Sequence, residues 1–241
     1  MRDEPLASRF HEAGCPVRPI GSHPRVRIRE DGRAVVSQAG SVLLIETVRK
    51  TGLDQAISAA LTPWRKPRAI HDPGKMLVDL ALAVAPGGDC LADITLLRSE
   101  PAVFGPVASD PTVSRLIDTL ATSGEKALTA IRAARSEVRR RVWELAGNQA
   151  PDTGGQVTVD LDGVLVVAHS DKQNAVPTWK KSYGHHPLMG FVDHGPGGTG
   201  EPVAACRDPG TKMGLLTCPC RCLGHVLPRS AAAWRHRLGS A

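Results

Sequence analysis

The chain has 241 residues, enough for one large domain or two small ones, and its 30 Lys+Arg against 24 Asp+Glu give a net charge of +6. Aromatic residues make up only 3% of the sequence, so the core must be built mainly from aliphatic side chains. No apolar run reaches the roughly 18 to 20 residues of a membrane span, and the acidic start MRDEPLASRF is unlike a secretory signal, which predicts a cytoplasmic protein without a membrane partner.

The first half of the chain is predicted to be mainly helical. Residues 1–23 have a mixed, proline-punctuated composition typical of a flexible arm, and residues 26–37 are expected to form two short strands around an Asp-Gly turn. A helix then begins at Ser41 and runs to about Lys50, and a second one spans residues 53–62, before Pro63.

An aspartate followed by proline marks the start of two later helices. Asp72 and Pro73 are expected to open a helix up to Ala85, and Asp110 and Pro111 a helix over 110–121. The aspartate caps the first turn, and proline suits the first helical position because its missing N–H would have no partner there. The segment 89–99 between them offers one more helix.

The longest predicted helix runs from about Glu125 to Ala146. Its apolar residues recur at spacings of three and four, as in a single buried stripe. The predicted stripe consists of Ala127, Ile131, Val138, Val142 and Leu145, and the arginines that lie largely away from it are Arg132, Arg135, Arg139 and Arg140. Residues 24–147 are therefore expected to form a mainly helical region.

A turn-rich linker is predicted at 148–155, NQAPDTGG, and the periodicity changes after it. Residues 156–162 and 164–170 read as strands that are separated only by Gly163, so we expect them to pair with each other in antiparallel fashion. A third strand is expected within 186–194. An antiparallel meander should thus begin at about residue 156.

Two aspartates, Asp160 and Asp162, lie two residues apart on the first of these strands and therefore on the same face. Because adjacent carboxylates repel each other, such a pair is usually compensated by a metal ion, a cation or a shared proton. The apolar run before them is expected to carry the pair inward. The alternative is that one aspartate merely caps the turn at Gly163.

The string DLDGVLV by itself resembles the first motif of haloacid-dehalogenase-type phosphatases. That family would use Asp160 as the nucleophile and Asp162 as the acid-base, with Mg²⁺ neutralising the phosphate. Its parallel sheet, however, requires a helical crossover soon after the first strand, whereas this sequence offers another strand directly. The phosphatase is therefore the weaker alternative.

Seven strings occur in an order that resembles the N-terminal half of a DDE-type transposase of the insertion-sequence 1380 family. They are HDPGK (71–75), GGDCLADI (87–94), ASDPTVSRLID (108–118), DLD (160–162), AHSDK (168–172), PTWKK (177–181) and FVDHGPGGTGEP (191–202). The resemblance covers roughly residues 25–205. It implies an α/β fold in which an incomplete ribonuclease-H-like catalytic domain (156–205) follows a helical DNA-binding region.

The resemblance also implies roles for individual residues. Asp162, or less strongly Asp160, would be the first metal-binding aspartate for Mg²⁺ or Mn²⁺ in a two-metal phosphoryl transfer. The segment 108–118 resembles the second helix of a helix-turn-helix, and a packing helix is the alternative. Residues implied in contacts with DNA are Thr112, Ser114, Arg115, Arg139, Arg140, Lys172, Lys180 and Lys181. For any single one of the arginines and lysines at 139–181, a solvated surface charge is the stronger interpretation.

The implied partners are double-stranded DNA, at terminal inverted repeats and at the target, and, for self-association, a second copy or a full-length transposase. Such a protein would be associated with the nucleoid.

The tail at 206–241 differs from the rest in composition, with Cys206, Cys218, Cys220 and Cys222 in 36 residues. A zinc knuckle is one interpretation, but C-x-C-x-C is tighter than the usual ligand spacing. The preferred hypothesis is a tail translated out of frame, which would make the chain a truncated, inactive transposase. A DNA-binding fragment that inhibits transposition is the alternative.

Overall fold

The computed structural model describes residues 20–25, 40–151, 153, 157–168, 175–178, 181–195 and 200–206. The chain divides into two compact units, which we name the helical unit (Met1–Thr47 and Ile57–Ser123) and the sheet unit (Val48–Ala56 and Gly124–Ala241). The predicted hairpin at 26–37 and the tail at 207–241 lie outside the described residues. Within the described part, no helix is both long and apolar enough to cross a membrane.

The helices expected before residue 124 are all present. They are α1 (Ser41–Thr51), α2 (Leu53–Leu61), η1 (Thr62–Trp64), α3 (Pro73–Val84), η2 (Leu91–Asp93), α4 (Ile94–Arg98), α5 (Pro101–Phe104) and α6 (Asp110–Ser123). The predicted cap of α3 is confirmed, since the Asp72 carboxylate accepts a hydrogen bond from the Lys75 backbone N–H at 3.1 Å. At α6 the prediction was wrong: Asp110 is itself helical and its carboxylate binds Arg98 Nη1 at 2.7 Å.

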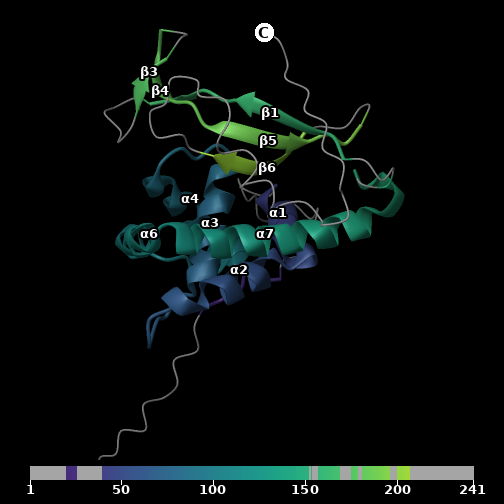
Figure 1. Ribbon diagram of the computed structural model, residues 1–241. Helices are drawn as coiled ribbons and strands as arrows, with labels where there is room; N and C mark the ends of the chain where they lie inside the picture. The colour runs from purple at the N-terminus through teal and green to yellow at the C-terminus, as the bar shows by residue number, and fades with distance from the viewer. Residues whose placement is uncertain are drawn as a thin grey trace, which may run out of the picture. The chain divides into compact units, whose positions relative to one another are not determined.

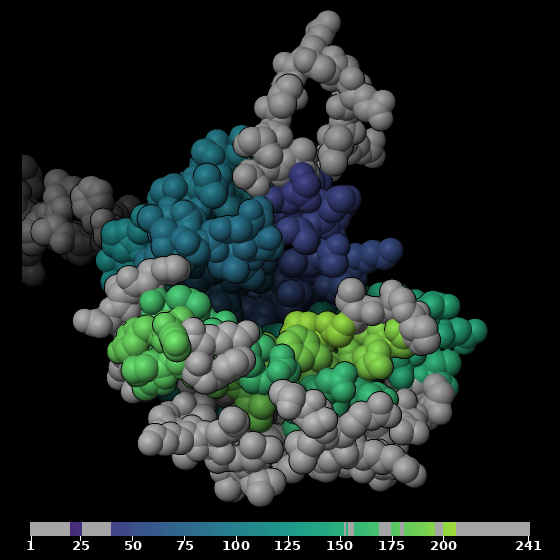
Figure 2. Space-filling model, turned by 90° about the horizontal axis from the view of Figure 1, so that it is seen from above, coloured from purple at the N-terminus to yellow at the C-terminus, as the bar shows by residue number. Residues whose placement is uncertain are grey.

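The helical unit has an aliphatic core in which α3, α4 and α6 meet. Its buried members are Met76, Ile94, Ala108, Val113 and Leu116. Helix α3 also approaches α2 closely at a glycine, because a Cβ atom on Gly74 would lie 2.4 Å from Ser58 Cα. Figure 2 shows the part of this unit around α3 and α4, in blue, as closely packed atoms.

Helix α7 (Glu125–Ala146) has the predicted bounds, but the predicted buried stripe is only partly confirmed. Ala127 is buried as predicted, and Ile131 and Val138 are half-buried, whereas Val142 is 38% exposed and Leu145 is 63% exposed. The other buried residues of the helix, Ala134, Arg139 and Trp143, were not predicted. The large indole of Trp143 offers more apolar area than any aliphatic side chain of the helix, and it lies on the side that packs against the sheet.

The described residues of the sheet unit form six short strands, helix α7 and η3 (Gly147–Gln149), in addition to the segment Val48–Ala56. The strands are β1 (Val159–Gly163), β2 (Val166–Val167), β3 (Val176–Pro177), β4 (Tyr183–His185), β5 (Leu188–Val192) and β6 (Glu201–Cys206). They make two three-stranded sheets, with the orders β1-β5-β6 and β2-β4-β3. Figure 1 shows α7 lying along one side of β1, β5 and β6.

The expected pairing between the strands on either side of Gly163 is not formed. β1 pairs with β5 and β2 pairs with β4, both in antiparallel fashion. The chain continues through Gly163 instead of turning back, so its partner is the third predicted strand. At Gly184 the two backbones approach closely, since a Cβ atom there would lie 2.1 Å from the Val166 carbonyl oxygen.

The coarse α/β architecture with antiparallel three-stranded sheets is thus confirmed, although the strands that make the meander are not the ones expected. Every named strand pair in the described part of the chain is antiparallel. After β1 the chain enters β2 without an intervening helix. This arrangement removes the basis of the phosphatase alternative, which needs a helical crossover to a parallel strand.

Candidate functional site

The two aspartates of the DLD motif lie on the exposed face of β1. Burial alternates along the strand, with Val159 and Leu161 half-buried and Asp160 and Asp162 exposed. Across the ladder Asp160 lies opposite Phe191, and Asp162 lies opposite Met189. The predicted common face is confirmed by this alternation, whereas the expected inward orientation was wrong.

The apolar face of the same sheet explains why the carboxylates point outward. Val159 and Leu161 pack against a cluster of buried residues made of Trp143, Val192 and Val203. Because successive side chains of a strand point to opposite faces, burying these two residues leaves both aspartates on the other face. The sheet therefore presents the pair to solvent.

The donor set of this pair suits a hard divalent cation, which prefers oxygen ligands. Along a strand, residues two apart have Cα atoms roughly 6 to 7 Å apart, so two carboxylates can converge on one ion. In the described part of the chain, no ion pair or hydrogen bond engages either carboxylate. No third side chain there completes a three-ligand group with them.

One three-ligand group does occur among the described residues, in the helical unit at Asp89, Cys90 and Asp93. Its geometry has a local explanation, because Asp93 Oδ2 accepts hydrogen bonds from the backbone N–H groups of Cys90 (3.0 Å) and Asp89 (2.9 Å). These bonds lower the pKa of Asp93. We therefore attribute the proximity of these three residues to the hydrogen bonds at the start of η2 and not to a metal site.

The residues implied in DNA contacts on α6 lie in its first two turns. Arg115 is exposed, and Thr112 and Ser114 are half-buried. Arg115 Nη2 donates to Thr112 Oγ1 at 3.0 Å, and the Ser109 hydroxyl lies 3.0 Å from the same oxygen. The structure thus brings a guanidinium and two hydroxyl groups together at the beginning of the helix.

The neighbouring arginines of α7 have opposite environments. Arg139 was expected on the surface but is only 8% exposed, and its Nε donates to Glu201 Oε1 at 2.6 Å. Arg140 is exposed and forms ion pairs with Glu137 and Glu144 on its own helix. We therefore assign Arg139 to the packing of α7 on β6, and we note that the charge of Arg140 is compensated locally.

One of the three lysines implied in DNA contacts lies among the described residues. Lys172 and Lys180 lie outside the described residues. Lys181 is exposed and has a left-handed backbone, with φ of 58°. It belongs to a turn in which its N–H donates to the Thr178 carbonyl at 3.1 Å and Thr178 N–H donates to the Ser182 carbonyl at 2.7 Å.

Glu201 is the centre of a polar cluster that the sequence did not indicate. Oε2 accepts hydrogen bonds from Trp143 Nε1 at 3.0 Å and His194 Nε2 at 3.1 Å, in addition to the bond from Arg139 to Oε1. Burial favours a higher pKa of Glu201, but these hydrogen bonds outweigh it, so its pKa is lowered. The cluster joins α7, β6 and the segment after β5.

Arg139 and Arg140 allow a matched prediction about the free energy of unfolding. Arg139→Gln is expected to lower the free energy of unfolding by about 2 kcal/mol, because it removes a nearly buried hydrogen bond between charged groups. Arg140→Gln is expected to change it little, because both of its ion pairs are exposed. Urea denaturation of the two variants measures this difference, and equal effects would contradict the assignment of Arg139.

The lowered pKa of Glu201 predicts a contribution to stability that depends on pH. The ionised form is favoured in the fold, so its contribution is complete above the unfolded carboxyl pKa, near 4.5, and is lost as the pH falls through the lower folded value. In Glu201→Gln this contribution is missing, so the variant should lose less stability than the wild type between about pH 5 and 3. Urea midpoints across this range test the prediction, and parallel curves would contradict it.

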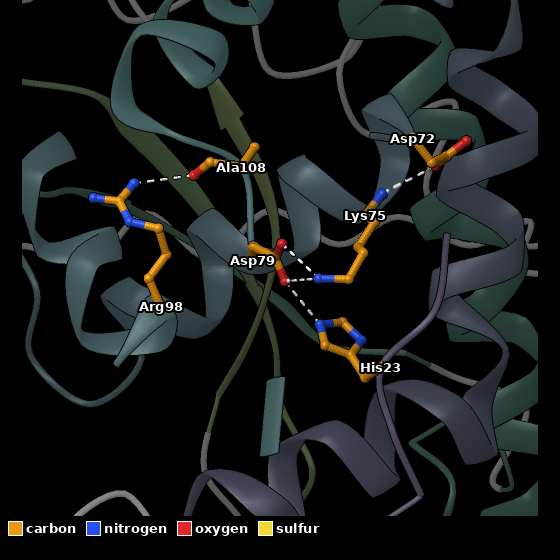
Figure 3. A network of polar contacts seen from close by, with 6 residues as sticks. All are labelled: His23, Asp72, Lys75, Asp79, Arg98 and Ala108. Atoms are coloured by element: carbon orange, nitrogen blue, oxygen red, sulfur yellow. Dashed lines mark hydrogen bonds and ion pairs between the residues drawn. The ribbon is translucent and has the colours of Figure 1, made fainter. Parts of the chain in front are cut away.

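A second polar cluster, shown in Figure 3, is buried in the helical unit. Lys75 Nζ donates to both oxygens of Asp79 at 2.9 and 2.8 Å, and His23 Nε2 lies 2.8 Å from Asp79 Oδ1. The i,i+4 spacing of Lys75 and Asp79 is visible in the sequence, but their burial is not. Residues of the motif HDPGK therefore have structural roles. Asp72 caps α3, Gly74 permits the close contact with α2, and Lys75 forms the buried ion pair.

Comparison with known proteins gives one family. A family model described as "Transposase DDE domain group 1" matches residues 18–235. The match includes described residues of both units and extends past residue 205, where the resemblance in the sequence was expected to end. No curated protein and no solved structure matches the chain.

Proposed function

Because the chain belongs to the transposases with a DDE domain of group 1, we propose that it binds the ends of an insertion sequence and that Asp160 and Asp162 take part in metal-dependent phosphoryl transfer. The observation that carries this proposal is the pair of carboxylates on the exposed face of β1. Both are free of competing partners in the described part of the chain, so they remain open to a cation. The finer assignment to the insertion-sequence 1380 family, with a ribonuclease-H-like fold, belongs to the same proposal.

The chemistry assigns distinct tasks to the residues of the chain. A bound divalent ion, Mg²⁺ or Mn²⁺, would polarise the scissile phosphate and lower the pKa of the attacking water. Asp162, with Asp160 beside it, would hold that ion on the open face of the sheet. The sheet, whose inner face packs against Trp143 of α7, would keep the two carboxylates in position.

The helical unit supplies the proposed contacts with double-stranded DNA. The guanidinium of Arg115 and the hydroxyls of Thr112 and Ser114 at the start of α6 suit phosphate oxygens or base edges. Loss of a single phosphate contact should weaken binding similarly across sequences, whereas loss of a base contact should relax specificity at one position. Arg115→Gln, assayed against several repeats, separates these two roles.

A second candidate function is that this chain binds DNA without cutting it. It is favoured by one observation: among the described residues, only two carboxylates come together on the sheet. Two-metal phosphoryl transfer uses a larger set of clustered ligands. Such a protein would occupy the ends of the element and inhibit a complete transposase, either by competition or by assembling with it.

One experiment separates these functions. The chain is incubated with a labelled duplex taken from the DNA that flanks its gene, with Mg²⁺ or Mn²⁺, and is assayed by gel shift and for nicking. Binding with nicking supports the transposase, and binding without nicking supports the inhibitor. Absence of binding to any flanking repeat would contradict both.

The out-of-frame origin of residues 206–241 is a further part of the proposal. Their cysteine-rich composition supports it, whereas the family match, which continues to residue 235, speaks against it. Translation of the next reading frame of the gene tests it directly. A continuation that carries further carboxylates in a transposase-like context is expected. A frame without such a continuation would leave the tail as the native sequence.

A further inference from the structure

The two small sheets share one long β-ribbon that passes through both. Gly163 pairs with Leu188 in the first sheet, and Val166 pairs with His185 in the second, so each strand advances three residues between the two pairs. The intervening Val164 N–H donates to the Pro187 carbonyl at 3.0 Å. The register is therefore maintained across the break, and residues 159–168 run against residues 183–192.

Pro187 gives a physical reason for the break between the two sheets. It accepts the hydrogen bond from Val164 but has no N–H to return one, so the ladder lacks one bond at this place. Figure 1 shows β3 and β4 beyond the end of β5, past the strand β6 that flanks only the first part of the ribbon. The part of the ribbon that β2 and β4 form therefore extends beyond the sheet of β1, β5 and β6.

The constant register places chemically different groups along one face. Residues directly opposite each other in an antiparallel ladder share a face, and every second residue of a strand returns to it. The face that carries Asp160 and Asp162 therefore also carries Val166 with His185 and, at the end, Ala168 with Tyr183. Val166 is 48% exposed and Tyr183 is 38% exposed, and Figure 2 shows this end of the ribbon, in green, at the surface.

The two ends of the ribbon carry different groups. The carboxylates of Asp160 and Asp162 lie at its base. Among the described residues of 164–187, the one Lys, Arg, Asp or Glu is the exposed Lys181, two residues before Tyr183. A lysine and an exposed aromatic ring suit a polyanion that carries flat bases.

We infer that this face of the ribbon binds the DNA that flanks the scissile phosphate, with Tyr183 stacked on an unpaired base and Lys181 at a phosphate. The inference rests on the proposed function, because the scissile phosphate is placed at Asp160 and Asp162. From Asp162 to the pair of Ala168 and Tyr183 the strand advances six residues, about 20 Å. That length corresponds to about six nucleotides of duplex.

Photocrosslinking tests this placement. A duplex from the flanking repeat is substituted with iodouracil at successive positions, irradiated with the full chain in the absence of divalent ions, and the crosslinked peptide is identified. Tyr183 is the one tyrosine of the sequence, so a tyrosine adduct has a unique assignment. We expect it about six nucleotides from the scissile phosphate.

Two variants test the stacking and the charge. Tyr183→Ala should weaken binding about tenfold, the size expected for loss of one base stacked on a ring, and Tyr183→Phe should bind like the wild type. Lys181→Asn removes the charge and suits the left-handed backbone, and it should reduce the slope of log affinity against log salt by about one.

Three outcomes would overturn the inference while leaving the proposed function intact. They are normal DNA binding by Tyr183→Ala, crosslinks that map only to other segments, and a loss of self-association instead of DNA affinity in the ribbon variants. Urea denaturation of Tyr183→Ala shows that it is folded. A wild-type chain that binds no DNA would instead overturn the proposed function and the inference together.

Discussion

The variant Asp79→Asn is expected to lose about 3–5 kcal/mol of the free energy of unfolding, because it leaves the Lys75 ammonium group buried without its counter-charge. In the wild type both side chains are 1% exposed. The asparagine keeps the shape of the aspartate and can retain the contact with His23 Nε2, so the main change is the loss of the negative charge. Urea denaturation at neutral pH measures this loss.

A double variant tests whether the charge is the cause. Lys75→Met/Asp79→Asn removes both charges and should recover most of the lost stability, since neutral replacements of a buried ion pair cost little. The control is Asp118→Asn, which removes an exposed carboxylate from α6. A loss in Asp79→Asn no larger than in this control would contradict the role of the buried pair.

The variant Asp162→Asn is expected to weaken binding of Mn²⁺ by at least about tenfold, because changes in metal-site partners alone cost about ten- to a hundredfold and this change removes a charged ligand. If the wild type nicks DNA, the same variant should lose that activity. Mn²⁺ binding is measured by titration calorimetry in the presence of the flanking duplex, which needs no turnover.

The neighbouring carboxylate and a distant one serve as comparisons. Asp160→Asn should have the smaller effect, since the resemblance implies Asp162 as the principal ligand. Asp54→Asn removes a carboxylate from α2 while retaining an oxygen for the Gln55 backbone N–H, and it should bind Mn²⁺ like the wild type. Equal affinity in Asp162→Asn and Asp54→Asn would contradict the proposed metal site.

Local signals predicted the helices well. Pro73 after the capping Asp72 marks the start of α3, and the predicted bounds of α7 at Glu125 and Ala146 agree with the structure. Such signals lie within one or two turns of the residue that they describe, so they need no knowledge of the rest of the fold. The buried face of α7 was predicted only in part, because it depends on what packs against the helix.

Strand partners were predicted less well, for a related reason. The alternation in β1 was sufficient to place Asp160 and Asp162 on one face, since the period of two is a local property of the backbone. Gly163 was read as a turn, although the chain passes through it and pairs with β5, more than twenty residues later. Pairing over such a distance depends on the loops and the other strands, which periodicity does not describe.

The sequence by itself determined the helix positions, the common face of the two aspartates and the transposase family, because these depend on local spacing and on the order of short motifs. The tertiary structure decided which charges are solvated. Arg139 and Arg140 are identical in type and adjacent, yet one is buried against Glu201 and the other is exposed. Likewise only packing shows that Lys75 and Asp79 form a buried pair. Burial depends on elements brought together from distant parts of the chain, and the free energy of a charge depends above all on its burial.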